Sequence, residues 1–127
     1  MNNINLIPLT GIPKVKVGDE ISTLIIKSIK RKKIKISKND LIVIAHKIVS
    51  ISENRFVELN KVKVGKRAIS LSKKIDKSKE FCQLILDNSK KIIKIKKGVI
   101  ITENRLGIIT ANAGIDQSNI NKKDFCL

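Results

Sequence analysis

The stretch Asp40-Leu41-Ile42-Val43-Ile44-Ala45-His46-Lys47 decides the fold that we expect for this chain. Leu41 to Ala45 are apolar at every position, and a strand that is apolar on both faces is typical of the interior of a sheet. The run stops abruptly at His46 and Lys47, at the end of a buried strand, where α/β folds usually place ligands. We therefore predict a central strand over Leu41–Ala45, with a polar pair at its end.

His46 and Lys47 differ in what they can do at such a strand end. His46 is the only histidine in the sequence. No second histidine or paired carboxylate lies in register with it, so a polar strand-end residue explains His46 better than a general base does. Lys47 is the better candidate for a contact with phosphate.

Other strands are expected on both sides of the central one. Short apolar or alternating runs bounded by turn residues favour strands, and glycine and proline end the first of them at Thr10-Gly11-Ile12-Pro13. We interpret Ile48–Ile51 and Phe56–Leu59 as a hairpin around the turn Ser52-Glu53-Asn54-Arg55. The expected strands beside the central one are Ile4–Leu9, Ile48–Ile51, Phe56–Leu59, Ile92–Lys96, Val99–Thr102 and Leu106–Ala111.

The 3.6-residue period predicts three helices. One follows Gly18-Asp19, with Asp19 as the expected N-cap, and the others cover Lys66–Ile75 and Lys79–Asn88 as a helical hairpin. The basic run Lys30–Lys33 suits the negative end of a helix dipole, so a solvated helix end explains it. The fold class is therefore α+β or mixed α/β, with one mixed sheet of roughly five to seven strands and helices mainly on one face.

The composition is that of one domain, residues 1–127, with 42% apolar residues and a net charge of +16. Such a charge attracts polyanions, which keeps open a basic module that binds RNA. Against that reading, lysine supplies most of the charge, and the absence of Trp and Tyr removes most stacking platforms for bases.

Cys82 and Cys126 have no metal-site or redox spacing, and no apolar run is long enough for a bilayer. We expect a reduced, cytoplasmic protein.

The stretch Ile108–Asn119 brings oxygen-bearing side chains together after an apolar run that ends in small residues. Carboxylate, hydroxyl and carboxamide oxygens at the end of a strand suit a hard cation or a nucleotide phosphate. The alternative is a turn in which these side chains hydrogen-bond their own backbone. The pattern alone favours the turn.

Three segments in this order resemble one known family. They are Pro8–Pro13 followed by Gly18-Asp19, the stretch Asp40–Ser50, and the loop Asn112–Asn119. Together they resemble the coenzyme F-420 gamma-glutamyl ligases, which extend a deazaflavin coenzyme with glutamate. The resemblance implies that GTP activates a carboxylate of the coenzyme precursor as an acyl phosphate, and that the amine of L-glutamate displaces phosphate to form an amide.

The resemblance also implies roles for individual residues. Asp116 corresponds to a metal-binding aspartate, and the ion would be Mn²⁺ or Mg²⁺, in agreement with oxygen ligands. The residues that correspond to nucleotide-binding positions are Gly11, Ile12, Pro13, Lys14, His46, Lys47 and Asn119.

Two departures from the family pattern matter. Ile51 stands where the pattern has a lysine, so a cation expected near the phosphates is missing. The family has a second half with further acidic metal ligands, whereas one aspartate cannot build a two-metal site. We therefore expect the N-terminal part of a larger two-domain ligase fold, inactive alone and completed by a C-terminal half, in a homodimer. The polyanion-binding module and an inactive remnant of the ligase stay as alternatives.

Overall fold

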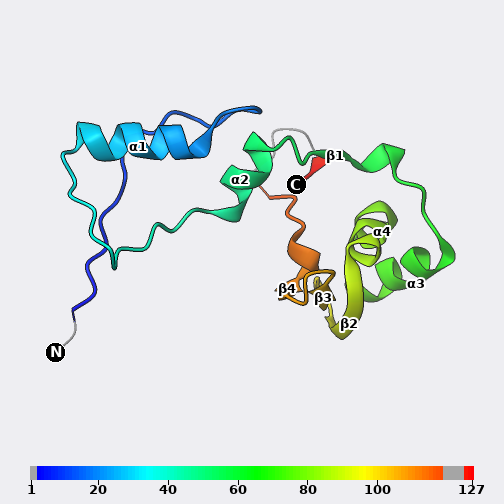
Figure 1. The fold of residues 1–127 in the computed structure, drawn as a ribbon. Coiled ribbons are helices and arrows are strands. Elements are labelled where there is room, and N and C mark those ends of the chain that lie inside the picture. The colour runs from blue at the N-terminus through cyan, green and yellow to red at the C-terminus, as the bar shows by residue number, and fades with distance from the viewer. Residues whose placement is uncertain (1–2, 119–124) are drawn as a thin grey trace. The chain divides into compact units, whose positions relative to one another are not determined.

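The structure is a computed structural model that describes residues 3–118 and 125–127. Its contacts divide the chain into two compact units, unit 1 (Met1–Arg55) and unit 2 (Phe56–Leu127), and each is considered by itself (Figure 1). That both units belong to a single domain stays a prediction. Among the described residues, no helix combines the length and the apolar character that a membrane span requires.

Unit 1 contains the predicted helix α1 (Ile21–Arg31) and a second helix, α2 (His46–Ser52). Ile25 and Ser28 are the buried residues of α1, on the face that the sequence pattern indicated. The predicted N-cap is wrong by one residue, because the cap is Glu20. The hydroxyls of Thr23 and Ser22 donate to its carboxylate at 2.6 and 2.8 Å, and these hydrogen bonds lower the pKa of Glu20.

The strands expected in unit 1 are wrong. Ile4–Leu9 and Leu41–Ala45 lie outside the helices and strands, and Ile48–Ile51 belongs to α2. Leu41 and Val43 are 90% and 91% exposed, so the run expected at the centre of a sheet lies at the surface. A strand needs a neighbour that pairs its backbone N–H and C=O groups. The described part of unit 1 supplies no strand that could do so.

Unit 2 confirms the helical hairpin and the strands that follow it. Its elements are β1 (Val57–Glu58), the short 3-10 helix η1 (Leu59–Lys61), α3 (Lys66–Ile75), α4 (Lys79–Asp87), β2 (Ser89–Lys96), β3 (Val99–Asn104), β4 (Ile109–Ala111), the 3-10 turn η2 (Asn112–Gly114) and β5 (Phe125–Cys126). Strands β2, β3 and β4 form an antiparallel sheet in that order, and β1 pairs with β5. The prediction that Phe56–Leu59 pairs with Ile48–Ile51 in a hairpin is therefore wrong.

The fold class is confirmed as α+β, but the single mixed sheet is wrong, because the described residues form two small antiparallel sheets. Helices α3 and α4 pack on each other and on β2 (Figure 1). Ile100 and Thr102, alternate residues of β3, are fully buried, as expected for a strand with one covered face. The core also contains Ile75 and Ile85, both with no exposed surface.

Candidate functional site

The candidate nucleotide segment Gly11–Lys14 is held at its start by the last turns of α1. The Thr10 carbonyl accepts hydrogen bonds from the Arg31 guanidinium (Nη2, 2.6 Å) and from the buried Ser28 hydroxyl (3.0 Å). Gly11 has a φ of +72° and lies so close to the Arg31 guanidinium that a Cβ would collide with it. The positive φ favours glycine here, and a side chain at this position would displace the flexible end of Arg31.

The same segment presents several hydrogen-bond donors. The backbone N–H groups of Gly11, Ile12 and Lys14 make no hydrogen bond within the residues that the structure describes. Pro13 has no N–H to offer. The ammonium group of Lys14 and the Arg31 guanidinium add positive charge beside these donors. Backbone N–H groups combined with cationic side chains can bind phosphate.

Arg31 is the residue that the sequence analysis missed. Its place in a basic helix end indicated only a solvated cation, and no local pattern connects it to Gly11. The contact arises because α1 brings its C-terminal turn back beside Thr10 and Gly11, which precede the helix in the sequence. Sequence periodicity does not show this arrangement.

His46 and Lys47 lie at the start of α2 rather than at the end of a strand. His46 is exposed and Lys47 is half-buried. The residues on either side of this pair, Ala45 and Ile48, line a groove of about 850 Å³ in unit 1. Ile12, Pro13 and Lys14 line the same groove, so unit 1 brings two of the candidate segments to one surface feature.

Asp116 belongs to unit 2, whereas the candidates Gly11–Lys14, His46 and Lys47 belong to unit 1. It is half-buried, and its Oδ1 accepts a hydrogen bond of 2.7 Å from the backbone N–H of Ser118. This is the turn that the sequence pattern alone favoured. Asp116 does not line the shallow pocket of unit 2. The other candidate in this loop, Asn119, lies outside the described residues.

Cys126 lies close enough to Asp116 to respond to its charge. Burial of the thiol and, to a smaller extent, the negative charge of Asp116 raise the pKa of Cys126 to about 11. The thiol is therefore protonated at neutral pH, which makes it a poor nucleophile and a poor metal ligand.

Asn112 has a structural role rather than a ligand role in the described fold. Its Oδ1 accepts a hydrogen bond of 3.0 Å from the backbone N–H of Ile100. This bond joins the loop after β4 to the central strand of the sheet.

The residues present do not make a complete cation site by themselves. In residues 3–118 and 125–127 there is no group of three or more His, Cys, Asp or Glu side chains that could hold a metal ion. Mn²⁺ and Mg²⁺ need several oxygen ligands, of which Asp116 would supply one carboxylate.

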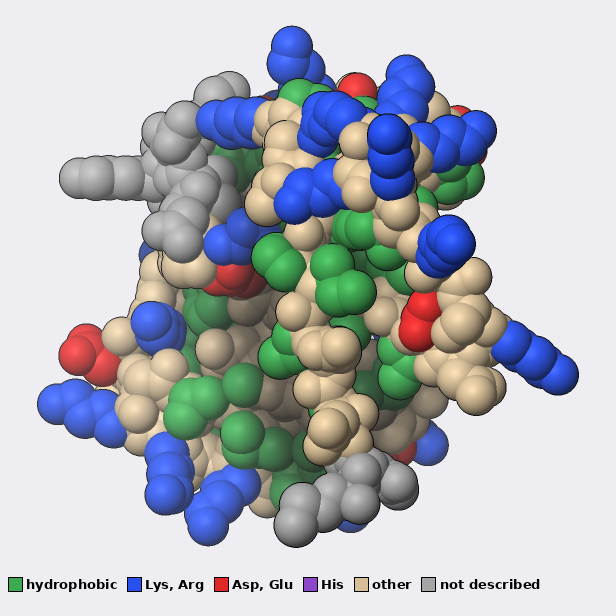
Figure 2. Space-filling view, turned by 90° about the vertical axis from the view of Figure 1, so that its left-hand side faces the viewer, with side chains coloured by type: hydrophobic (Ala, Val, Ile, Leu, Met, Phe, Trp, Pro, Cys, Tyr) green, Lys and Arg blue, Asp and Glu red, His purple; other side chains and the backbone are tan. Residues whose placement is uncertain are grey.

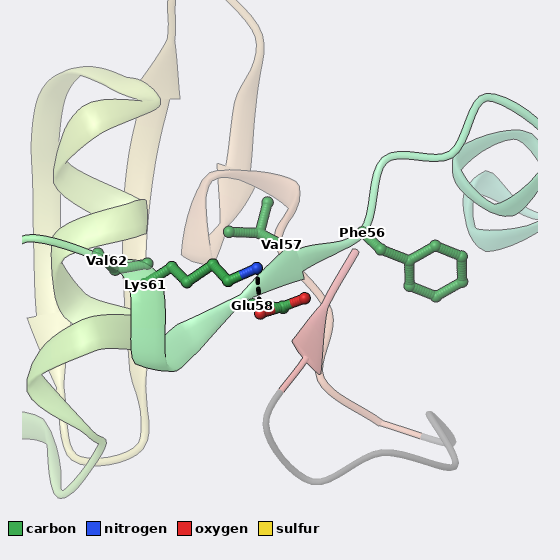
Figure 3. Close-up of a pocket in the computed structure, with 5 residues that line it drawn as sticks. All are labelled: Phe56, Val57, Glu58, Lys61 and Val62. Atoms are coloured by element: carbon green, nitrogen blue, oxygen red, sulfur yellow. Dashed lines mark ion pairs between the residues drawn. The ribbon is translucent and has the colours of Figure 1, made fainter.

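A shallow pocket of about 330 Å³ lies at the start of unit 2, lined by Phe56, Val57, Glu58, Lys61 and Val62 (Figure 3). Lys61 and Glu58 form an ion pair of 2.8 Å within it. Because the lysine is 75% exposed, this is a solvated surface pair of small energetic value.

Comparison with known proteins gives the family. A profile described as F420-0:gamma-glutamyl ligase matches residues 11–127. The chain is 36% identical to the coenzyme F420:L-glutamate ligase of Methanothermobacter thermautotrophicus over 117 residues, which is 92% of this chain and 46% of that protein. It is 42% identical to the ligase of that name from Methanocaldococcus jannaschii over 87 residues, 68% of this chain and 35% of the relative. For the Archaeoglobus fulgidus ligase, the identity is 26% over 124 residues, 98% of this chain and 47% of the relative.

The chain spans less than half of the length of these curated relatives. The range matched by the family profile includes every candidate residue of the sequence analysis, from Gly11 to Asn119. The resemblance noted in three separate segments thus extends over nearly the whole sequence. This chain belongs to the F420-0:gamma-glutamyl ligase family.

Proposed function

We propose that this chain is the N-terminal part of a GTP-dependent ligase that forms an amide between L-glutamate and a carboxylate of a deazaflavin coenzyme precursor. The observation that carries the proposal is the family match over residues 11–127. It is supported by 36% identity, across 92% of this chain, to a protein named coenzyme F420:L-glutamate ligase.

The reaction requires a phosphoryl transfer before the amide forms, because a carboxylate oxygen is a poor leaving group. Transfer of the γ-phosphoryl group of GTP to the precursor carboxylate gives an acyl phosphate and GDP. The amine of L-glutamate then attacks the acyl carbon, loses a proton and expels inorganic phosphate. Such a sequence depends mainly on positioning and on neutralising charge at the phosphates.

In this proposal, described residues of unit 1 bind the phosphates of GTP. The unpaired N–H groups of Gly11, Ile12 and Lys14 can donate to phosphate oxygens, and the Lys14 ammonium offsets their charge. Ile51 replaces the lysine of the family pattern, and Arg31, whose guanidinium lies beside Gly11, supplies a cation in its place. In this proposal His46 and Lys47 form a second contact with the nucleotide.

Asp116 contributes one carboxylate to the divalent-cation site, and Asn119 contacts the nucleotide. A bound Mn²⁺ or Mg²⁺ would neutralise the charge that develops between the phosphates and the attacking oxygen. The remaining ligands come from the half of the ligase that this chain does not span. The isolated chain is therefore inactive, and the complete enzyme functions as a homodimer.

The experiment is an assay of phosphate release from GTP in the presence of Mn²⁺, L-glutamate and the deazaflavin precursor. The 127-residue chain is compared with a chimera in which the unmatched remainder of the M. thermautotrophicus ligase follows Leu127. We expect glutamate-dependent release by the chimera and none by the chain alone. Release by the chain alone contradicts the partial-site proposal, and a folded chimera that neither binds GTP nor releases phosphate contradicts the ligase assignment.

The polyanion-binding alternative makes a different prediction. A basic RNA-binding module would bind RNA with an affinity that falls steeply as salt increases, and it would show no preference for GTP or Mn²⁺. The same purified chain can be titrated with both ligands.

A further inference from the structure

Unit 1 carries an apolar surface that nothing in its described part covers. Residues 6–9 and 41–44 both line its groove, and we call these two segments the apolar wall. Leu6, Leu41 and Val43 are 89%, 90% and 91% exposed. Single exposed apolar residues are ordinary, whereas a contiguous group of them along one groove indicates a binding surface.

The two segments of the apolar wall belong to stretches that the sequence predicts as strands, Ile4–Leu9 and Leu41–Ala45. Leu41–Ala45 has the residue pattern of a buried strand, yet neither segment has a strand partner in the described part of unit 1. Within the described part of unit 1, the exposed side chains of the apolar wall are therefore not covered by other residues, and its backbone does not pair with a strand. One partner that adds a strand and an apolar face would cover these side chains and pair with the backbone.

The position of the wall limits what can cover it. Ile12, Pro13 and Lys14 line the same groove, so a partner seated on the wall lies next to the candidate nucleotide segment. A nucleotide triphosphate does not suit the wall itself, because burying charged phosphates against leucine and valine is unfavourable. The partner must therefore be apolar, and it must bring its own polar groups to the edge formed by Gly11–Lys14.

The half of the ligase that this chain does not span is the candidate for this partner. The relatives are more than twice as long as the part of them that matches here, as the 46% coverage of the M. thermautotrophicus protein shows. In the proposed ligase Asp116 is one metal ligand, and residues 3–118 and 125–127 hold no group of three or more His, Cys, Asp or Glu side chains that could complete the site. We propose that the apolar wall is the docking surface for that second half, which pairs with its β-prone segments. This inference rests on the proposed ligase function.

The charge around the wall further defines the partner. Figure 2 shows apolar side chains on one face of the chain, with lysine and arginine side chains mostly toward its edges. The whole chain carries a net charge of +16. The docking half therefore presents an apolar face bordered by acidic side chains, since complementary charge at the rim fixes the orientation of the two halves.

Hydrogen exchange of individual backbone amides tests this inference directly. The 127-residue chain is compared with the chimera that carries the remainder of the M. thermautotrophicus ligase. Amides of residues 6–9 and 41–44, apart from Pro8, should exchange at least about tenfold more slowly in the chimera. Amides of α3 (Lys66–Ile75) report in both proteins whether unit 2 is folded. The two halves co-expressed as separate chains should give the same protection.

Two matched variants assign the protection to the wall. Val43→Asp places a charge on the wall, and Leu106→Asp places one on a residue of unit 2 that is 82% exposed. Because Val43 is 91% exposed, Val43→Asp should leave the isolated chain folded. We expect Val43→Asp to remove the protection of both segments in the chimera, and Leu106→Asp to retain it.

Three results would overturn the inference. The first is equal exchange of the wall in the chain and in the folded chimera. The second is protection in the chain alone that increases with protein concentration, which would show that a second copy covers the wall. The third is protection of residues 6–9 and 41–44 in the isolated chain by GTP and Mn²⁺ to the extent seen in the chimera, which would show that the nucleotide itself covers the wall. Failure of the ligase assignment would appear differently, as a protected wall in a chimera without phosphate release.

Discussion

Asp116 and Leu127 exchange both of their backbone hydrogen bonds, each N–H donating to the carbonyl of the other at 2.9 Å. The adjacent residue, Cys126, is 1% exposed within the core and pairs with Val57 of β1. The backbone of the candidate metal-binding residue is therefore fixed by the same segment that completes the core of unit 2.

Removal of residues 125–127 should destabilise unit 2. The deletion exposes part of the core around Leu59 and breaks the backbone pairs with β1 and Asp116. We expect a loss of about 3 kcal/mol in the free energy of unfolding, measured by urea denaturation. Leu106→Ala, at a residue 82% exposed, is the control and should change the midpoint little. An unchanged midpoint after the deletion would contradict the role given to this segment.

Gly11→Ala and Gly18→Ala separate backbone strain from close packing in unit 1. Both glycines have a positive φ, +72° and +83°, but only at Gly11 would a Cβ meet another group, the Arg31 guanidinium. Each substitution should cost about 1 kcal/mol through strain. Gly11→Ala should cost about 1 kcal/mol more, because it displaces Arg31 from the Thr10 carbonyl. Amide exchange of α1 measures the difference, and equal effects of the two variants would refute the contact.

The core of unit 2 depends on Ile75 of α3, which has no exposed surface. Ile75→Ala should lower the free energy of unfolding by about 2 to 5 kcal/mol, since it leaves a cavity among packed side chains. Ile69→Ala, on the same helix at a residue 42% exposed, is the matched control and should cost much less. Thermal or urea unfolding of the two variants checks the prediction, which fails if their costs are similar.

Cys126 should make the stability depend on pH in the alkaline range. Its pKa is raised from 9.0 to about 11 in the folded protein, so between these values the unfolded state releases the thiol proton and the folded state keeps it. The stabilising contribution is complete below pH 9.0 and is lost as the pH rises towards about 11. The difference in unfolding free energy between the wild-type protein and Cys126→Ala should decrease over that window. A constant difference would contradict the raised pKa.

Sequence patterns predicted unit 2 well and unit 1 poorly, for a physical reason. Lys66–Ile75 and Ile92–Thr102 form local helices and a hairpin whose partners are close in the sequence. Leu41–Ala45 has an equally clear pattern, but an apolar run becomes a strand only where another strand pairs with it. No strand pairs with it in the described part of the chain. Periodicity also missed the helical start at His46.

The candidate site was predicted only in part. Of the residues that the resemblance selected, Ile12, Pro13 and Lys14 line the groove of unit 1, and the neighbours of His46 and Lys47, Ala45 and Ile48, line it too. The resemblance could not show that Arg31 packs against Gly11, because that contact depends on how the chain returns over α1. For Asp116, the local turn was predicted from the residue types alone.

The melting temperature of the chain with GTP and Mn²⁺ measures the proposed nucleotide and metal binding most directly. Selective binding to the folded state raises the melting temperature, and the shift grows with ligand concentration. We predict a shift with GTP and Mn²⁺ that Asp116→Asn and Asp116→Ala abolish, while Asp87→Asn, at an exposed carboxylate in α4, retains it. Asp116→Asn keeps an oxygen for the Ser118 N–H and removes only the charge. No shift in the wild-type chain, or an equal shift in the Asp116 variants, would contradict the assignment of this loop to a nucleotide and metal site.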